Sequence, residues 1–397
     1  MTNWNQHEGD SRNAGTRRDR DGPLRVETDW IVDLTGPVGS PVLDHDTVFV
    51  GTERGNLYAL ERETGRRRWT FETLSATNAT PIVTRDRLFL ATDDGTVYAI
   101  DPGTGDELWS TDLPASLSSS PTFDDGQLYV GHTAGLSALE GETGDVIWTH
   151  ETESAVVGCP AVGDETESAP LEESQPQAPE ADGLSVDVPT EIEAETETVS
   201  ADAGVYVGTE GGTVYGLECE TGEEAWTAPA DGGIAGGPTV ADGLVYVSDD
   251  DGTMIAMDAD SGQSWFTYEI RDAFSTSATV LPELDATFLG ATDGYLHVTD
   301  TTFGRRKLRG WLFAKKGVQL DGPVHGSPVV VGDVVCVADS TGSLYGLDIA
   351  DDCTHLWHFG VDDAISSTPA VGDEQLFVGS DGGQLYCLTW NPDEARP

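Results

Sequence analysis

A unit of about 40 residues recurs along this chain and limits what it can fold into. The segments "GNLYALERETGRRRW" (55–69), "GTVYAIDPGTGDELW" (95–109) and "GTVYGLECETGEEAW" (212–226) are variants of one pattern. Each ends on a tryptophan, and tryptophans at this spacing run through most of the chain: Trp30, Trp69, Trp109, Trp148, Trp226, Trp265, Trp311 and Trp357. A period near 40 with strand-like content is typical of a propeller or a solenoid.

Each repeat has the same internal order. A small residue followed by proline begins a first strand, and an alternating apolar segment such as "TVFVGT" (47–52) predicts a second. A glycine turn leads to a third strand such as "LYAL" (57–60), and a Thr-Gly or Ser-Gly turn leads to the strand that carries the tryptophan. Four short antiparallel strands per repeat, placed around an axis, predict an all-β propeller.

The first strands indicate eight blades. Their starting dipeptides are Ser40-Pro41, Thr80-Pro81, Ser120-Pro121, Cys159-Pro160, Gly237-Pro238, Ser277-Ala278, Ser327-Pro328 and Thr368-Pro369. The last repeat stops before a fourth strand, whereas "VETDWIVDLTG" (26–36) precedes the first repeat and carries Trp30 at the right offset. We therefore predict an eight-bladed propeller whose last four-stranded blade is closed by the N-terminal strand, so that no blade edge is left unpaired.

Three regions follow from this interpretation: an N-terminal leader (1–25), the propeller (26–397), and an insertion in the fourth blade (165–201). The 78 residues between Trp148 and Trp226 leave room for a ninth, degenerate blade. The insertion, however, is rich in Glu, Pro and Ser and has neither a tryptophan nor a Thr-Gly turn. This composition favours a disordered acidic loop inside the first hairpin of the blade.

The eight tryptophans are expected to fill the wedge between neighbouring blades. Burying a side chain of this size contributes about 2–3 kcal/mol by area. The prediction is therefore that the repeated pattern builds the shape of the molecule.

The net charge of −51 restricts the environment and the partners. The chain has 71 acidic residues against 20 basic ones, and only three are lysine. An acidic disordered protein is one interpretation, but the regular apolar pattern argues against it. The other is a protein adapted to molar salt, where a Debye length of about 3 Å screens self-repulsion. Such a surface is not expected to bind nucleic acid or an anionic membrane.

Other features predict a cytoplasmic protein. No apolar run approaches the roughly 18 residues of a membrane span, and the first residues contain no apolar signal core. The five cysteines are far apart and are expected to be reduced thiols in strands.

The two faces of the predicted propeller differ in charge. The turns between second and third strands should form an acidic ring at the channel mouth, either a site for a cation or basic partner or an ordinary salt-adapted surface; they carry Glu53, Asp93, Asp94, Glu210, Asp249, Asp250, Asp251, Asp293, Asp339 and Asp381. The opposite face has a basic cluster of Arg305, Arg306, Lys307 and Arg309, which is either a candidate partner-binding patch or a solvated turn.

The repeat resembles a known family. "AIDPGTGDELW" (99–109) is similar to the A-x-D-x-x-T-G-x-x-x-W docking motif of quinoprotein-type propellers. "WNQHEGDSRNAG" (4–15) resembles the W-x-Q-x-x-x-D-x-x-x-x-G segment of proteins with PQQ-like (pyrroloquinoline quinone) repeats, which include the BamB-like outer-membrane assembly lipoproteins. The scarcity of lysine beside retained arginine resembles haloarchaeal members. The resemblance covers the chain except for the acidic insertion.

What the resemblance implies for chemistry is limited. Family enzymes of the alcohol dehydrogenase type use the quinone, a Ca²⁺ ion, a catalytic aspartate and usually an adjacent-cysteine disulfide, but no two cysteines are adjacent here. The eight histidines show no metal-ligand spacing. We therefore expect no catalytic residues, no quinone and no Ca²⁺.

The predicted function is that of a monomeric, non-enzymatic scaffold that binds a protein partner in a high-salt cytoplasm. The alternative is a quinoprotein-type dehydrogenase, or a propeller that binds a small ligand or Ca²⁺ in its central channel.

Overall fold

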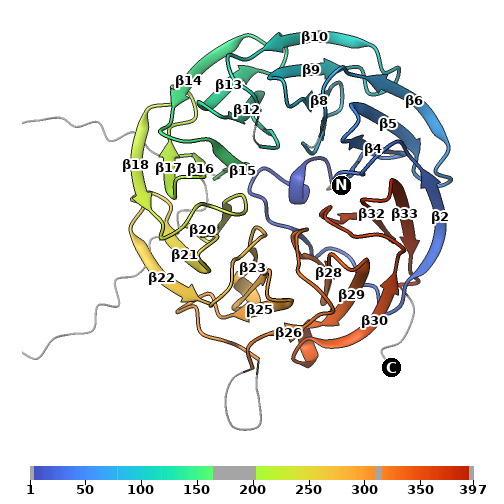
Figure 1. Cartoon of the computed structure of the whole chain (residues 1–397), viewed down its shortest axis with the longest axis vertical. Helices are drawn as coiled ribbons and strands as arrows, with labels where there is room; N and C mark the ends of the chain where they lie inside the picture. The colour runs from blue at the N-terminus through green and yellow to red at the C-terminus, as the bar shows by residue number, and fades with distance from the viewer. Residues whose placement is uncertain (1–3, 78, 118, 164–202, 309–314, 393–397) are drawn as a thin grey trace, which may run out of the picture.

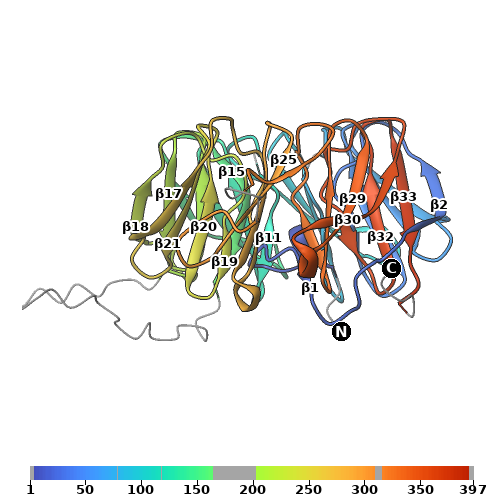
Figure 2. The ribbon, with the colours of Figure 1, turned by 90° about the horizontal axis from the view of Figure 1, so that it is seen from below.

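Eight blades, each of four antiparallel strands, stand around a central axis in the computed structural model, and one of the eight sheets has a fifth, parallel strand at its inner edge (Figure 1). The structure describes residues 4–77, 79–117, 119–163, 203–308 and 315–392. Seen from the side, the molecule is a disc with the turns of all blades on its two faces (Figure 2). The prediction of an all-β, eight-bladed propeller is confirmed.

The first four blades follow one another along the chain. Their strands are β3 (Val42–Leu43), β4 (Thr47–Thr52), β5 (Asn56–Glu61) and β6 (Arg67–Glu72); β7 (Ile82–Val83), β8 (Leu88–Ala91), β9 (Thr96–Ile100) and β10 (Glu107–Asp112); β11 (Thr122–Asp124), β12 (Gln127–His132), β13 (Gly135–Glu140) and β14 (Val146–Glu151); and β15 (Val156–Val162), β16 (Val205–Thr209), β17 (Thr213–Leu217) and β18 (Glu224–Pro229).

Blades five to eight continue the order around the ring. Their strands are β19 (Thr239–Ala241), β20 (Leu244–Ser248), β21 (Thr253–Asp258) and β22 (Ser264–Glu269); β23 (Thr279–Leu281), β24 (Ala286–Gly290), β25 (Tyr295–Thr299) and β26 (Val318–Gln319); β27 (Val329–Val331), β28 (Val334–Ala338), β29 (Ser343–Asp348) and β30 (Thr354–Gly360); and β31 (Ala370–Val371), β32 (Gln375–Gly379) and β33 (Gln384–Thr389) with β2 (Glu27–Asp33). Within the described ranges, three 3₁₀ turns complete the elements: η1 (His7–Gly9), η2 (Pro282–Leu284) and η3 (Ile349–Asp351).

The N-terminal strand closes the last blade, as the sequence predicted. Strand β2 pairs antiparallel with β33, and Trp30 lies opposite Cys387. The indole N–H of Trp357 donates to the carbonyl oxygen of Pro23 at 2.7 Å, so the segment leading into β2 supplies the acceptor that a third-to-fourth-strand turn supplies elsewhere. A further N-terminal strand, β1 (Thr16–Arg17), runs parallel to β27 at the inner edge of the seventh blade.

The core lies between neighbouring blades. One cluster, for example, joins Val42, Phe49 and Leu57 of the first blade to Leu88 and Ile100 of the second. Toward the outside of the ring, tryptophan indoles join neighbouring blades. Each of these indole N–H groups donates to a backbone carbonyl of the following blade or, for Trp357, of the leader: Trp30 to Arg62 (3.1 Å), Trp69 to Pro102 (3.1 Å), Trp109 to Gly141 (3.3 Å), Trp148 to Cys219 (2.9 Å), Trp226 to Ala259 (2.8 Å) and Trp357 to Pro23 (2.7 Å).

The turn glycines are required by this packing as well as by their backbone. Gly105 has φ +79°, and a Cβ there would lie 2.8 Å from the ring of Trp69. Gly222 has φ +69°, and a Cβ there would lie 2.4 Å from the ring of Trp148. Glycine is therefore needed at these turns for two reasons: it can adopt the left-handed conformation, and it leaves room for the indole of the preceding blade.

The expectation for Trp265 is wrong. Its side chain is 52% exposed, and Phe266 lies opposite Ala256, the register position that tryptophan holds in other blades. The cause is spacing: the docking residue stands four positions after the turn glycine, but Trp265 stands three after Gly262. Because strand side chains alternate, the one-residue difference turns the indole to the other side of the sheet.

The sixth blade also departs from the pattern. Leu308, four positions after Gly304, is buried in a cluster with residues of the seventh blade. Trp311, Arg309 and the predicted insertion at 165–201 lie outside the described residues.

Candidate functional site

The leader, residues 4–25, crosses one end of the central channel and bonds to the innermost strands of most blades. Its backbone carbonyls accept strand N–H groups in sequence: Trp4 from Leu43 (2.6 Å), Asn5 from Val83 (2.8 Å), Ser11 from Val162 (2.7 Å), Arg12 from Val240 (3.0 Å), Gly15 from Val330 (2.8 Å) and Arg17 from Gly332 (2.9 Å). In the third blade the Gln6 side chain accepts from Phe123 N–H (3.0 Å) and donates to its carbonyl (3.2 Å).

Two further side chains fix the leader. The Asn13 amide donates to the carbonyl oxygens of Cys159 (3.1 Å) and Pro238 (2.9 Å), in two neighbouring blades. The Arg17 guanidinium donates to the Val371 carbonyl (3.2 Å) in the eighth blade. Inner strand edges that would otherwise be unpaired are thus satisfied, and the leader closes the channel at this face.

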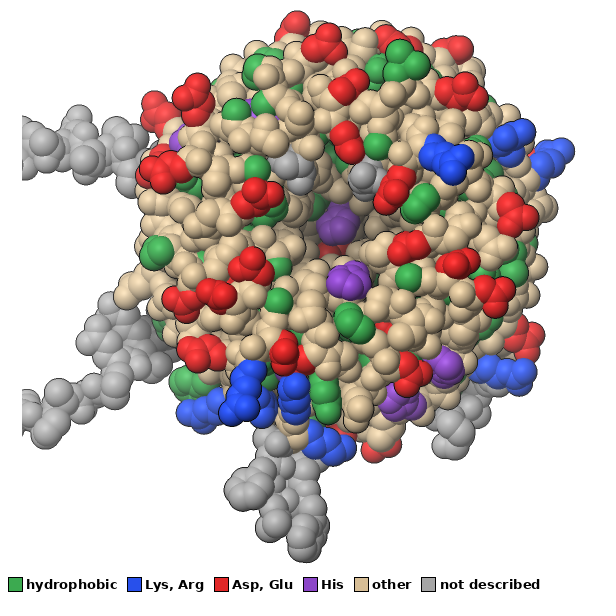
Figure 3. All heavy atoms as spheres, viewed as in Figure 1, with side chains coloured by type: hydrophobic (Ala, Val, Ile, Leu, Met, Phe, Trp, Pro, Cys, Tyr) green, Lys and Arg blue, Asp and Glu red, His purple; other side chains and the backbone are tan. Residues whose placement is uncertain are grey.

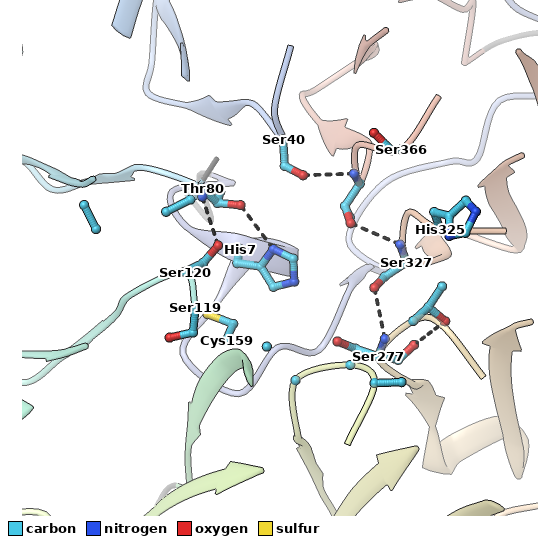
Figure 4. Close-up of a pocket in the computed structure, with 18 of the residues that line it drawn as sticks. His7, Ser40, Thr80, Ser119, Ser120, Cys159, Ser277, His325, Ser327 and Ser366 are labelled. Carbon is cyan, nitrogen blue, oxygen red and sulfur yellow. Dashed lines mark hydrogen bonds between the residues drawn. The ribbon is translucent and has the colours of Figure 1, made fainter. Parts of the chain in front are cut away.

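The other face opens into a cup with a volume of about 460 Å³. Figure 3 shows the cup as a central hollow with histidine side chains in it. Small residues that precede the first strands line its wall, and His7 of the leader and His325 are its two histidines (Figure 4). The cup is therefore open to ligands from this face alone, because the leader blocks the other.

Hydroxyl groups link adjacent blades around the wall. They accept backbone N–H groups from the neighbouring blade: Ser120 from Thr80 (2.9 Å), Ser327 from Ser277 (3.2 Å), Thr368 from Ser327 (3.1 Å) and Ser40 from Thr368 (2.9 Å) (Figure 4). Each accepting hydroxyl keeps its own proton, for which the described residues offer no acceptor. The wall thus presents hydrogen-bond donors.

The floor is formed by His7 and the residues around it. The His7 Nδ1 atom lies 3.3 Å from the Thr80 hydroxyl, and its Nε2 atom lies 3.2 Å from the Glu8 carboxylate. Burial raises the pKa of the Cys159 thiol, which also lines the cup, to about 12. Cys159 is therefore a protonated, poorly nucleophilic thiol at neutral pH.

The acidic ring expected at the mouth divides into two kinds of residue. Asp249 accepts the N–H of Thr253 (2.6 Å), Asp339 accepts that of Thr341 (2.9 Å), and Asp293 accepts that of Tyr295 (3.0 Å), so these three stabilise turns. Asp381 is partly exposed and accepts a hydrogen bond from the Ser366 hydroxyl (2.6 Å). The more exposed members of the expected ring are Glu53, Asp93, Asp94, Glu210, Asp250 and Asp251. Burial and the neighbouring Asp94 raise the pKa of Asp93, which lines the cup, so the carboxylates there repel one another.

The basic cluster is largely occupied by contacts within the molecule. Arg306 donates to the Tyr268 hydroxyl (3.2 Å), and the Lys307 ammonium donates to the Asp285 carbonyl (2.5 Å). The Arg305 guanidinium lies 4.6 Å from the centroid of the exposed Phe303 ring. Arg305, Arg306 and Lys307 are nevertheless all exposed, so the described part of the cluster lies at the surface.

The cup does not suit pyrroloquinoline quinone. A planar tricarboxylate requires cationic partners and a ring to stack on. The described lining residues include no arginine, lysine or tryptophan, and the single lining aspartate would repel the ligand.

No group of three or more His, Cys, Asp or Glu side chains that could hold a metal occurs among the described residues. The described helices are short 3₁₀ turns, none of which could cross a membrane.

Comparison with known proteins places this geometry in context. The family model described as outer membrane protein assembly factor BamB matches residues 11–155, 93–175 and 177–388. A serine/threonine-protein kinase, AfsK of Streptomyces griseus, is 31% identical over 203 residues; these are 47% of this chain and 24% of the kinase, so the chain spans about a quarter of that protein.

Two solved structures share the fold. BamB from Moraxella catarrhalis has a TM-score of 0.66 at 18% identity, over 92% of this chain and 100% of that one. A europium-containing methanol dehydrogenase has a TM-score of 0.72 at 12% identity, over 98% of each chain. At these identities the likeness shows a common architecture.

Proposed function

Because the chain belongs to the BamB-like family of PQQ-repeat propellers, we propose that it is a non-enzymatic scaffold that binds a protein partner through its cup-bearing face. The observation that carries this proposal is the one-ended channel: the leader fills one end, and turns from eight blades converge around the opening at the other. A rigid ring of turns around a hollow can accept a protruding segment of a partner.

The chemistry of the opening favours a basic partner segment. Exposed carboxylates on the turns, Asp250 and Asp251 among them, combine with a net charge of −51 to attract cationic side chains at close range. We place the protein in a salt-rich cytoplasm, where screening leaves such short-range contacts effective and suppresses non-specific attraction.

The relatives support a modular binding role and no particular chemistry. The same repeats are found in an assembly factor, in a kinase and, by fold, in a dehydrogenase. A blade motif that packs sheets together does not determine activity, which depends on the site added to the fold.

The experiment is capture at molar KCl, followed by purification of the complex. Wild type is compared with Asp250→Asn/Asp251→Asn at the opening and with Glu72→Gln, an exposed outer-strand control. We expect wild type and the control to retain one partner in a stoichiometric complex, and the double variant to bind it roughly tenfold or more weakly, as for loss of close charge pairs. Equal retention by all three proteins would contradict the proposal.

A second candidate function is binding of a small polar ligand in the cup, which the four wall hydroxyls with spare protons favour. An activity assay after addition of quinone and Ca²⁺ distinguishes small-ligand binding from the dehydrogenase alternative. Alcohol-dependent dye reduction by the reconstituted protein would support a dehydrogenase and contradict both binding proposals.

A further inference from the structure

Three buried oxygen atoms in the leader have no hydrogen-bond partner. Seven buried side-chain nitrogen or oxygen atoms are unpaired in the described part of the chain, and three of them are Glu8 Oε1, Glu8 Oε2 and Asn13 Oδ1. Glu8 and Asn13 are each 1% exposed. Buried polar groups are normally satisfied, and an unpaired buried carboxylate is especially unfavourable.

Glu8 and Asn13 lie in one closed loop of the leader. The Gly15 N–H donates to the Glu8 carbonyl (2.9 Å), which closes residues 8–15 into a loop. Asn13 lies inside this loop, and its amide contacts the Cys159 carbonyl (3.1 Å). The Glu8 carboxylate lies 3.2 Å from His7 Nε2, and His7 lines the floor of the cup. Asn13 therefore adjoins Cys159 through its amide nitrogen, and Glu8 is buried in the same loop next to His7 at the floor of the cup.

The orientation of Asn13 is determined by its neighbours. Its amide nitrogen faces the carbonyls of Cys159, Pro160 and Pro238 at 3.1, 3.3 and 2.9 Å. A carbonyl can only accept, so the NH₂ group must lie on this side and Oδ1 on the other. The unpaired oxygen is thus a fixed feature.

The loop backbone is held in an uncommon conformation at both residues. Glu8 has φ +52° and Asn13 has φ +56°, in the left-handed region that few residues with a side chain adopt. Such conformations persist where the surroundings determine them, often at ligand sites.

We propose that Glu8 and Asn13 form part of a site for a hard cation beneath the cup. The unpaired atoms are all oxygen acceptors, which are the ligands that K⁺, Na⁺ and Ca²⁺ share, and a cation would neutralise the buried carboxylate. Backbone carbonyls and water would complete the coordination. The site is independent of partner binding at the opening.

His7 offers a competing explanation. Its Nε2 atom lies 3.2 Å from Glu8 Oε1 without forming a hydrogen bond, so a protonated imidazole could balance the carboxylate. In that case Glu8→Gln and His7→Gln should lower stability alike, and neither stability should depend on a specific cation.

The test is thermal unfolding of the full chain after chelation, in tetramethylammonium chloride at constant ionic strength, with K⁺, Na⁺ or Ca²⁺ added in separate arms. We expect one cation to raise the midpoint saturably in wild type, in His7→Gln and in the exposed-carboxylate control Glu53→Gln. In Glu8→Gln the response should need roughly tenfold more cation or vanish, because the ligand charge is lost.

Two results would overturn the proposal. One is an identical response of wild type and Glu8→Gln to all three cations, which would indicate general screening. The other is the absence of any cation-specific response in wild type. Should Glu8→Gln fail to fold, Glu8→Asp keeps the charge and retracts the oxygens; it should shift the cation response, whereas an unchanged response would count against the site.

Discussion

At the scale of single residues, a shift of one position in the repeat decides whether a tryptophan is buried between two blades or exposed. Trp226 is 7% exposed and bonds to the next blade, whereas Trp265, one position too early in its repeat, is 52% exposed. The sequence contained the signal for this difference in the glycine-to-tryptophan spacing. The spacing between successive tryptophans did not reveal that Trp265 is exposed, because it gives the length of the repeat and not the side of the strand on which a residue lies.

The two tryptophans form a matched pair for mutation. Trp226→Ala should lower the free energy of unfolding by about 3–5 kcal/mol, because it leaves a cavity in a seam and removes the bond to Ala259. Trp265→Ala should change it by less than about 1 kcal/mol, as for an exposed position. Chemical denaturation at fixed salt measures both, and equal losses would contradict the assignment of Phe266 as the docking residue.

At the scale of elements, the third blade contains a polar ladder across three strands, of which the His132 and Ser137 side chains are buried. His132 on β12 bonds through Nε2 to the Ser137 hydroxyl on β13 (3.0 Å), which contacts Thr149 on β14 (2.9 Å). The Ala134 N–H donates to His132 Nδ1 (3.2 Å), so the proton of the neutral ring is on Nε2. Burial lowers the pKa of His132 below its ordinary value of 6.5.

This ladder predicts a pH dependence of stability. The folded pKa of His132 is depressed, so the unfolded chain takes up the proton first as the pH falls. The contribution of His132 is therefore complete above about pH 6.5 and is lost below it, with a slope of at most about 1.4 kcal/mol per pH unit. The difference in unfolding free energy between wild type and His132→Asn, measured from pH 8 to 5, should shrink as the pH falls. A constant difference would contradict this account.

The leader is the element that sequence reasoning described least well. Its motif placed the chain in a family, but the contacts that matter are backbone carbonyls bonding to the inner strands of five blades, and side-chain patterns do not encode these. The cup was missed for a related reason. Ser40, Ser120, Ser327 and Thr368 were interpreted only as strand starts, since their convergence depends on closure of the ring.

At the scale of the whole molecule, the N-terminal segment has two separate roles. Residues 4–25 close the channel and form the floor of the cup, and β2 supplies the outer strand of the eighth blade. The blade count and the closure could be predicted because repeat period and strand order are properties of the chain. The difference between the two faces could not, because it arises from where the leader lies.

The central claim is that the first part of the chain completes both the ring and its channel, and truncation tests it most directly. Thermal and chemical unfolding should be measured for the full chain, for a chain lacking residues 1–25, and for one lacking residues 1–36. We expect a single cooperative transition for the full chain, a lower midpoint without the leader, and loss of cooperative unfolding when β2 is also removed. A chain lacking residues 1–36 that unfolds in one cooperative transition at the midpoint of the full chain would contradict the claim.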